Sequence, residues 1–426
     1  MVLSQLHEIF VSSEGVCTDT RKITSGCIFF ALKGANFNGN TFALEALRLG
    51  AGYAVVDEDI DSPDSRLIRV NDVLGALQDL ANYHRRKLKA RIIGITGTNG
   101  KTTTKELMYA VLAAHFKTKA TEGNLNNHIG VPLTLLSFKG DEEFGIVEMG
   151  ANHSGEIAEL CEIAEPDFGL ITNVGKAHLE GFGSFEVIVK TKKGLYDHIA
   201  EKGGTIFINS ADEILIDNKV ENRVYYGTNS SDFCRGVLLD ASPFLRFSIF
   251  GQDGETEIVS KLIGAYNFEN MLAAVAVGKY FGVPENKIIS AIEGYVPSNN
   301  RSEFRKTDSN ELILDAYNAN PSSMEKALEN FANMNKPNKL AILGDMFELG
   351  ADSQFYHEKI ANKVSSLGLH ALFVGEEFYK INPDSPEFYQ QINMLMDKIK
   401  THPISGRTIL IKGSRGVKLE RLVEYL

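Results

Sequence analysis

The sequence predicts an α/β protein of three domains, whose central domain has a mainly parallel sheet and a phosphate-binding loop. The chain has 426 residues, and about 150 residues per domain implies two to four domains. Short apolar runs rich in Val and Ile alternate with helical stretches, which is typical of parallel sheets with crossover helices. One such run, RIIGIT, ends in a glycine-rich loop that leads directly into a helix.

The first domain is predicted to span residues 1–88 and to be a small α/β unit. Strands are expected at CIFFAL (27–32) and YAVVDE (53–58). A helix is expected at NTFALEALRLGA (40–51), because its apolar residues recur at helical spacing. The charged stretch 84–91 leads into the buried-strand pattern of RIIGIT, so the boundary is placed after residue 88.

The second domain is predicted to span residues 89–298. Its apolar strands alternate with helical stretches, as in a parallel sheet with crossover helices. These strands are GIVEM (145–149), FGLITNV (168–174) and TIFIN (205–209). Residues 219–262 predict a strand-rich insert, and a helix is expected from residue 267 onward.

The third domain is predicted to span residues 299–426, after a hinge at PSNN (297–300). Pro, Ser and Asn favour turns, which is why this segment is placed between domains. The alternation of strands and helices then starts again. The expected strands lie in ELILDAY (311–317), KLAILGDM (339–346), LHALFVG (369–375) and RTILIKG (407–413).

Composition excludes several classes of protein. Lys and Arg number 44 against 55 Asp and Glu, so the net charge is −11, and 43% of residues are hydrophobic. This balance indicates a globular protein. It disfavours a nucleic-acid partner, because a protein that binds nucleic acid needs a basic face.

The 4 cysteines form no CxxC pair, which favours a reducing compartment. No apolar run reaches the roughly 18 residues of a membrane span, and the N-terminus does not resemble a signal peptide, so a cytoplasmic protein without integral membrane contact is expected.

The strongest local signal is GITGTNGKTTTKELMYAVL, residues 94–112. Glycines free backbone N–H groups for phosphate oxygens, the following helix adds its dipole, a lysine supplies a cation, and a hydroxyl can ligate Mg²⁺. Only the shorter GxxGK[ST] spacing is met, and an incidental glycine turn before a helix is the alternative. The preceding strand and the amphipathic helix favour a nucleotide site. Its predicted contacts are Gly97, Thr98, Asn99, Gly100, Lys101, Thr102 and Thr103.

Acids, bases and cations near strand ends are candidates for the chemistry, because sites of α/β proteins assemble there. Glu148 ends a strand, and its carboxylate suits Mg²⁺, although a solvated strand-end acid is the alternative. His178 lies in a glycine-flanked loop, where a structural histidine is equally expected. Lys190, Lys192 and Lys193 lie on an expected helix, and a solvated charged face is their simplest explanation.

Polar loops elsewhere suit further ligands. Residues 121–134 offer amide groups that suit an amide or sugar ligand, or form an Asn-rich turn. Asp315 directly follows a strand, and Asn320 either caps the helix expected at Pro321 or contacts a ligand. Lys412 and Arg415 could hold a carboxylate or a phosphate. Loops suited to ligand binding occur in all three predicted domains. This distribution predicts a cleft that closes by domain movement.

These motifs together resemble the Mur amino-acid ligases over essentially the whole chain. The matching segments are TDTRKITSGCIFFALKGANFNGN, GITGTNGKTTTKE, TEGNLNNHIGVPLTLL, EMGANHSGEI, TNVGKAHLEGFGS, DAYNANPSSM, LGDMFELG and KGSRG. Within these segments, YNANP and GNLNNHIGVP resemble the family member that adds D-alanyl-D-alanine. The resemblance implies a uridine-nucleotide domain, a central ATPase domain and a C-terminal Rossmann-like domain, in a monomer.

The implied reaction is ATP-dependent ligation of D-Ala-D-Ala to UDP-MurNAc-tripeptide through an acyl phosphate, in cytoplasmic peptidoglycan synthesis. The resemblance implies that Lys101, His178 and Lys192 are catalytic, with Lys192 carbamylated by CO₂. The implied Mg²⁺ ligands are Thr102, Glu148, His178 and the carbamylated Lys192. Beyond the loop, the implied nucleotide contacts are Asn267, Asn270, Arg301 and Asp315. The implied substrate contacts are Thr20, Arg21, Lys33, Gly34, Asn126, Asn127, His128, Asn318, Asn320, Lys412 and Arg415.

The sequence also departs from the family pattern. The usual KxKGE context reads Lys-Thr-Lys-Lys-Gly-Leu at 190–195, which leaves Lys192 or Lys193 as the modified lysine; register with Leu195 favours Lys192. Tyr266 replaces a frequent His, and Asn38-Gly39-Asn40 replaces DGH. The alternatives are a sibling Mur enzyme, a folylpolyglutamate synthase, or a regulatory P-loop ATPase. Pocket shape, which sequence does not specify, selects meso-diaminopimelate or lysine as the third residue of the tripeptide.

Overall fold

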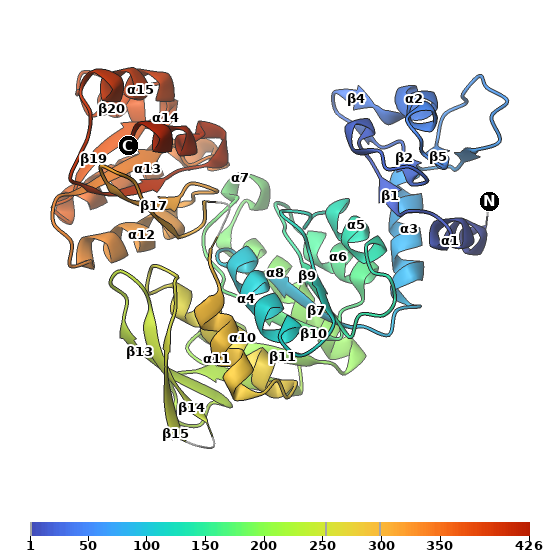
Figure 1. Ribbon diagram of the computed structural model, residues 1–426, viewed down its shortest axis with the longest axis horizontal. Helices are drawn as coiled ribbons and strands as arrows, with labels where there is room; N and C mark the ends of the chain where they lie inside the picture. The colour runs from blue at the N-terminus through green and yellow to red at the C-terminus, as the bar shows by residue number, and fades with distance from the viewer. Residues whose placement is uncertain (1, 252–253, 298–299) are drawn as a thin grey trace.

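The computed structural model describes residues 2–251, 254–297 and 300–426. Three α/β units follow one another along the chain, and the N-terminal and C-terminal units lie on opposite sides of the central one (Figure 1). Each unit has its own main sheet. The α/β fold class predicted from the sequence is therefore confirmed.

The N-terminal unit has a four-stranded parallel sheet of order β1-β2-β5-β6. Its strands are β1 (Val16–Cys17), β2 (Ile28–Phe30), β5 (Tyr53–Val56) and β6 (Leu67–Arg69), with a hairpin of β3 (Lys33–Gly34) and β4 (Phe37–Asn38). Its helices are α1 (Leu3–Val11), α2 (Ala43–Arg48) and α3 (Val73–Arg85), with 3₁₀ turns at Thr20–Lys22 and Gly39–Phe42. The helix expected from residue 40 begins only at Ala43, because the Asn38 side chain accepts from Asn40 N and caps a 3₁₀ turn there.

The central unit has a nine-stranded sheet of order β15-β14-β13-β12-β11-β10-β7-β9-β8. The strands from β13 to β8 in this order run parallel, whereas β13, β14 and β15 pair antiparallel. The bounds are β7 (Arg91–Thr96), β8 (Thr118–Ala120), β9 (Phe144–Glu148), β10 (Phe168–Ile171), β11 (Thr205–Asn209), β12 (Asn222–Gly227), β13 (Cys234–Asp240), β14 (Arg246–Gly251) and β15 (Gly254–Val259). The strand-rich insert thus extends the main sheet.

Helices cover both faces of this sheet, so the interior of β7 is apolar: Ile92, Ile93 and Ile95 are fully buried, in two separate clusters. Helix α10 is buried nearly all round, between α4 and the insert, which explains its almost continuous apolar sequence. The helices are α4 (Lys101–Ala113), α5 (Gly130–Leu136), α6 (Glu156–Ala164), α7 (Leu179–Phe182), α8 (Phe185–Lys202), α9 (Glu213–Ile216), α10 (Asn267–Tyr280) and α11 (Glu285–Gly294).

The C-terminal unit has a six-stranded sheet of order β16-β17-β21-β18-β19-β20, parallel except at β16. Its strands are β16 (Glu303–Lys306), β17 (Glu311–Asp315), β18 (Lys339–Gly344), β19 (His370–Val374), β20 (Phe388–Tyr389) and β21 (Thr408–Lys412). Its helices are α12 (Pro321–Asn333), α13 (Ser353–Ser366), α14 (Glu376–Tyr379) and α15 (Ile392–Thr401), with 3₁₀ turns at Gly350–Asp352, Arg415–Val417 and Leu419–Tyr425. The short edge strands β16 and β20 were not expected from the sequence.

The domain boundaries stay predictions. The hinge expected at 297–300 and the boundary at 298/299 fall on residues 298 and 299, which lie outside the described residues. Across the described ranges, no helix combines the length and the apolar character needed to cross a bilayer.

Candidate active site

The phosphate-binding loop joins the end of β7 to the start of α4 at Lys101, as the sequence predicted. Gly97 and Gly100 have φ of 146° and 79°, a region that favours glycine. A Cβ at Gly97 would stand 1.9 Å from Thr172 Oγ1, and one at Gly100 would stand 2.6 Å from Asn270 Oδ1. Both positions therefore require glycine, and the loop packs tightly between β10 and α10.

Lys101 Nζ folds back over this loop and donates to the carbonyls of Gly97 (2.7 Å) and Thr98 (3.2 Å). Burial lowers the pKa of the Lys101 ammonium. The first turn of α4 leaves its N–H groups directed toward the same space, which is where an anion is stabilised. The arrangement is suited to nucleotide phosphates.

Glu148 ends β9, which pairs with β7 so that Ile95 and Glu148 lie side by side. Its side chain is only 1% exposed. Oε1 accepts hydrogen bonds from Thr102 Oγ1 (3.2 Å) and Asn126 Nδ2 (2.8 Å), whereas the buried Oε2 has no hydrogen-bond partner among the described residues. A buried carboxylate oxygen without a donor is costly unless a cation or ligand satisfies it.

Lys192 lies on α8 and is 3% exposed. Burial, with a smaller contribution from the nearby Lys101 ammonium, lowers the pKa of Lys192 to about 7. Lys193 points elsewhere and donates to the carbonyl of Asp217 (2.6 Å), while Lys190 is exposed. Of the three lysines, only Lys192 is thus buried next to the phosphate-binding loop.

His178 lies in the loop after β10, directly before α7, with φ of 51°. Its Nδ1 is buried and forms an ion-pair contact with Oε2 of Glu348, which belongs to the C-terminal unit. The close contact with His178 lowers the pKa of Glu348. The candidate histidine is therefore held at the junction of two units.

A cavity of about 580 Å³ lies between the central and C-terminal units. Most of the predicted site residues meet there, from loops at the carboxyl ends of strands and from the first turns of α4 and α10. Those that line the cavity are Thr98, Asn99, Gly100, Lys101, Thr102, Thr103, Asn126, Asn127, His128, Glu148, His178, Asn267, Asn270, Arg301, Asp315, Asn318, Asn320 and Lys412.

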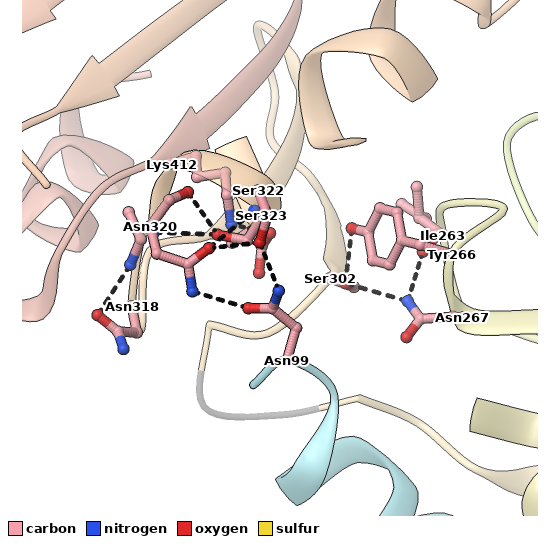
Figure 2. Close-up of polar contacts among 12 residues, drawn as sticks. Asn99, Ile263, Tyr266, Asn267, Ser302, Asn318, Asn320, Ser322, Ser323 and Lys412 are labelled. Carbon is pink, nitrogen blue, oxygen red and sulfur yellow. Dashed lines mark hydrogen bonds and ion pairs between the residues drawn. The ribbon is translucent and has the colours of Figure 1, made fainter. Parts of the chain in front are cut away.

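One side of the cavity brings the loop and the C-terminal unit into direct contact (Figure 2). Asn320 Nδ2 donates to Asn99 Oδ1 (2.8 Å), and Asn99 Nδ2 donates to Ser322 Oγ (2.9 Å). Asn320 also caps α12, since its Oδ1 accepts from Ser323 N (2.9 Å). The capping role and the site position considered from the sequence thus coexist in one residue.

Two substitutions of Asn320 separate these roles. Asn320→Ala is expected to lower the free energy of unfolding by about 1 kcal/mol through loss of the cap, measured by urea unfolding. Asn320→Asp keeps a capping oxygen, and stability should stay near wild type. Its added negative charge next to the phosphate-binding loop should weaken ATP binding about fivefold to tenfold, measured by calorimetry. Unchanged ATP affinity in Asn320→Asp would contradict this placement.

The opposite side of the cavity is formed by α10 and the start of the C-terminal unit. Asn270 Nδ2 donates to Asn267 Oδ1 (2.8 Å), and Asn267 Nδ2 donates to Ile263 O (2.8 Å) and Ser302 Oγ (3.2 Å). The hydroxyl of Tyr266 also bonds with Ser302 Oγ (3.1 Å) (Figure 2). These hydrogen bonds hold the wall of the cavity in place.

Three charged residues at the entrance to the C-terminal unit are already partnered. Arg301 lies over the ring of Tyr317, with its guanidinium carbon 3.6 Å from the ring centre. Lys412, only 2% exposed, pairs with Asp315 through Nζ and Oδ2 (2.6 Å), across neighbouring strands. The charge of Lys412 is therefore neutralised by Asp315 before any anion binds.

The remaining predicted residues do not line this cavity. Lys33 in the N-terminal unit pairs with Asp57 and Glu58 (both 2.9 Å), and Arg21 pairs with Asp19 (2.7 Å). Thr20 and Gly34 belong to the same unit, and Arg415 is exposed. Gly97 and Lys192 are also not among the residues that line the cavity.

Several cavity residues were not predicted. Asn173 holds the loop, because its side chain accepts from Asn99 N and donates to Asn99 O (both 3.0 Å). Tyr317 and Ser323 also line the cavity and flank the predicted asparagines. Asn173 stood in the glycine-flanked segment that supplied His178, and the other two stood in DAYNANPSSM, so proximity to those motifs was the available signal.

A phosphate-binding loop that opens into a cleft shared with a second α/β unit defines a P-loop nucleotide-binding protein. Two family models match the chain: "Mur ligase middle domain" over residues 95–278 and "Mur ligase, glutamate ligase domain" over residues 300–415. A UDP-N-acetylmuramoyl-tripeptide–D-alanyl-D-alanine ligase of Bacillus subtilis is 35% identical over 97% of this chain and 93% of its own. The chain belongs to the Mur ligase family.

Solved structures agree with this assignment. MurF from Acinetobacter baumannii has a TM-score of 0.87 and 28% identity, and the match covers 99% of this chain and 97% of that one. MurF from Thermotoga maritima, solved in complex with ADP, has a TM-score of 0.84 and 27% identity, with 97% of both chains covered. The relatives matched along this chain are named as ligases, and one of the matching structures holds ADP.

Proposed function

We propose that this protein is a cytoplasmic, monomeric ligase that uses ATP to join D-Ala-D-Ala to UDP-MurNAc-tripeptide, forming UDP-MurNAc-pentapeptide. One observation carries the proposal: the cleft joins a phosphate-binding loop, a buried carboxylate with a free oxygen and the C-terminal unit, in a chain matched along nearly its full length by a ligase of that name.

The reaction needs two steps. The C-terminal carboxylate of the tripeptide attacks the γ-phosphorus of ATP, so that a C–O–P bond forms and ADP leaves. The amine of D-Ala-D-Ala then attacks the acyl carbon, and phosphate leaves. Both steps depend on alignment of anions and on compensation of charge. Lys101 and the N–H groups at the start of α4 would offset the phosphate charge.

The donor set fits Mg²⁺, which supplies charge neutralisation on the phosphates when bound. Thr102 offers a hydroxyl, Glu148 a free carboxylate oxygen, and His178 an imidazole nitrogen. Within the described ranges, no three His, Cys, Asp or Glu side chains gather as a ready-made metal site. Substrate phosphates and waters commonly complete the coordination of Mg²⁺ beside one or two carboxylates, and a further anionic oxygen from the protein would strengthen this donor set.

Carbamylation of Lys192 would provide that oxygen. The lysine is buried without an acidic partner among the described residues, and its pKa near 7 makes the neutral amine, the form that reacts with CO₂, available at neutral pH. Carbamylation converts a buried cation, which is costly, into an anion beside Lys101. The environment of Lys193 does not favour carbamylation in this way, since its ammonium donates a hydrogen bond to Asp217 O.

Each of the three units is proposed to hold a different part of the substrates. The N-terminal unit, with Thr20, Arg21, Lys33 and Gly34, is proposed to hold the uridine nucleotide. Asn126, Asn127 and His128 would line the path of the muramoyl peptide, and Asn267, Asn270, Arg301 and Asp315 would contact ATP. Asn318, Asn320, Lys412 and Arg415 are proposed to hold D-Ala-D-Ala. Closure of the units over the cleft would exclude water from the acyl phosphate.

Phosphate release measured with each substrate omitted in turn tests the proposal. Release should require both UDP-MurNAc-tripeptide and D-Ala-D-Ala and should match pentapeptide formation. Turnover indifferent to both would instead favour a regulatory ATPase, and dependence on folate and glutamate would favour a folylpolyglutamate synthase. Tripeptides ending in meso-diaminopimelate and in lysine, compared at saturating D-Ala-D-Ala, identify the third residue.

A further inference from the structure

Glu348 is the one ionic contact partner of His178 among the described residues, and it comes from a different unit of the protein. His178 Nδ1 is buried, and the described residues offer it no hydrogen bond of regular geometry, although Glu348 Oε2 lies within ion-pair range. The histidine side chain as a whole is 24% exposed and lines the cleft. The ring therefore has a buried nitrogen that faces a carboxylate, while its exposed atoms face the cleft.

The loop that carries Glu348 is held firmly. Asp345 accepts from the backbone N–H groups of Glu377 and Phe378 at the start of α14 (both 3.0 Å). Met346 N donates to His357 Nε2, and Phe347 N donates to Ser414 Oγ (both 3.0 Å). Each residue before Glu348 is thus tied to the body of the C-terminal unit.

The same loop rests against the helix that follows His178. Glu348 has φ of 65° and Gly350 has φ of 56°, so the chain turns sharply there. A Cβ at Gly350 would lie 3.3 Å from the Cβ of Glu180 on α7. Figure 1 shows α7 at the edge of the central unit that faces the C-terminal unit. Left-handed backbone at a non-glycine residue costs free energy, and it is retained here where it directs Glu348 toward His178.

This contact bears on which ring nitrogen carries the proton. A carboxylate accepts hydrogen bonds only, so it favours a proton on Nδ1 and leaves the lone pair of neutral His178 on Nε2. Histidines that ligate metals commonly donate their other N–H to a carboxylate in this way. We propose that Glu348 is a positioning residue, which orients His178 and fixes its Nδ1–H tautomer so that Nε2 can bind the metal ion.

A consequence is that docking of the C-terminal unit completes the metal site in the central unit. Since this inference takes His178 as a metal ligand, it rests on the proposed function. The Asn99–Asn320 contact docks the same two units independently of Glu348. Loss of Glu348 should therefore change His178 without separating the units.

The test compares Glu348→Ala and Glu348→Gln with a matched control, Asp352→Ala, an exposed carboxylate in the neighbouring 3₁₀ turn whose side chain forms no cap. The first readout is the tautomer of His178, from two-bond ¹H–¹⁵N spectra of protein labelled at histidine, assigned with His178→Gln. The second is the affinity for Mn²⁺ in the presence of ADP, from electron paramagnetic resonance of free Mn²⁺.

Wild type and Asp352→Ala are expected to show the Nδ1–H form. Glu348→Ala should lose it and bind Mn²⁺ about tenfold to a hundredfold more weakly. Glu348→Gln, whose amide oxygen still accepts, should keep the tautomer and bind Mn²⁺ with intermediate affinity. An Nε2–H form in wild type, or unchanged Mn²⁺ affinity in Glu348→Ala, would overturn the inference. Neither readout needs turnover, so a wild-type protein that gives both expected results but forms no pentapeptide refutes only the proposed function.

Discussion

Lys192→Ala is expected to abolish pentapeptide formation, with a loss of about a thousandfold or more in kcat, and added bicarbonate should not restore it. The substitution removes the amine that would form the carbamate and with it an anionic oxygen for Mg²⁺. Removal of one preorganised charge-stabilising group costs about a hundredfold to a thousandfold in such sites, and the carbamate would contribute both charge and metal ligation. Coupled phosphate release and chromatography of the pentapeptide measure the effect.

Lys193→Ala is the matched control, because Lys193 is the next residue on α8 and bonds to Asp217 O outside the cleft. Its activity should stay close to wild type. Carbon-13 spectra with labelled bicarbonate should show a carbamate signal in wild type and in Lys193→Ala, and none in Lys192→Ala. Full activity in Lys192→Ala would refute the carbamate role, and loss of the signal in Lys193→Ala alone would transfer it to that residue.

Glu148→Gln should reduce kcat by about a hundredfold to a thousandfold, since metal binding supplies several kcal/mol of charge stabilisation. The amide oxygen can still accept from Thr102 and Asn126, so the local hydrogen bonds survive. What changes is the free oxygen, because the amide nitrogen that replaces it is neutral and cannot ligate Mg²⁺. The apparent Mg²⁺ requirement, measured by titration of phosphate release, should rise.

Glu143→Gln provides the comparison for Glu148→Gln. Glu143 precedes the same strand, β9, at the opposite edge of the sheet and is exposed. The change is chemically identical but distant from the phosphate-binding loop, so activity and Mg²⁺ dependence should stay at the wild-type values. An equal loss in both variants would indicate a general effect of charge and would argue against a metal site at Glu148.

Local patterns predicted those parts of the site that depend on a few consecutive residues. The phosphate-binding loop was predicted with the correct helix start at Lys101, since glycine, lysine and threonine at that spacing have one common use after a buried strand. The helix start at Pro321 was also predicted from a local pattern, because Asn followed by Pro is a strong signal for the N-terminus of a helix. In contrast, the helix expected from residue 40 began later, because a side-chain cap outweighed the apolar periodicity.

Local patterns could not predict contacts between segments that are distant in the sequence. Asn99 and Asn320 are 221 residues apart in the chain and meet only because the C-terminal unit docks on the loop. The pairing of Lys412 with Asp315 depends on β17 and β21 becoming neighbours, which the order of strands in the sequence does not reveal. Lys412, which the sequence predicted to hold an anion, thus has Asp315 as a partner. The position of Glu348 next to His178 was not predicted.

The sequence by itself determined the α/β class, the nucleotide loop and, through its motifs, the Mur ligase family, because these depend on residue types at short spacing. Tertiary structure alone decided which of two adjacent lysines is buried. Consecutive residues on a helix point about 100° apart, so packing of α8 against the sheet buries Lys192 beside Lys101 and turns Lys193 toward Asp217. Burial disfavours the charged amine at one position and not at its neighbour, and this difference in environment makes Lys192 the candidate for carbamylation.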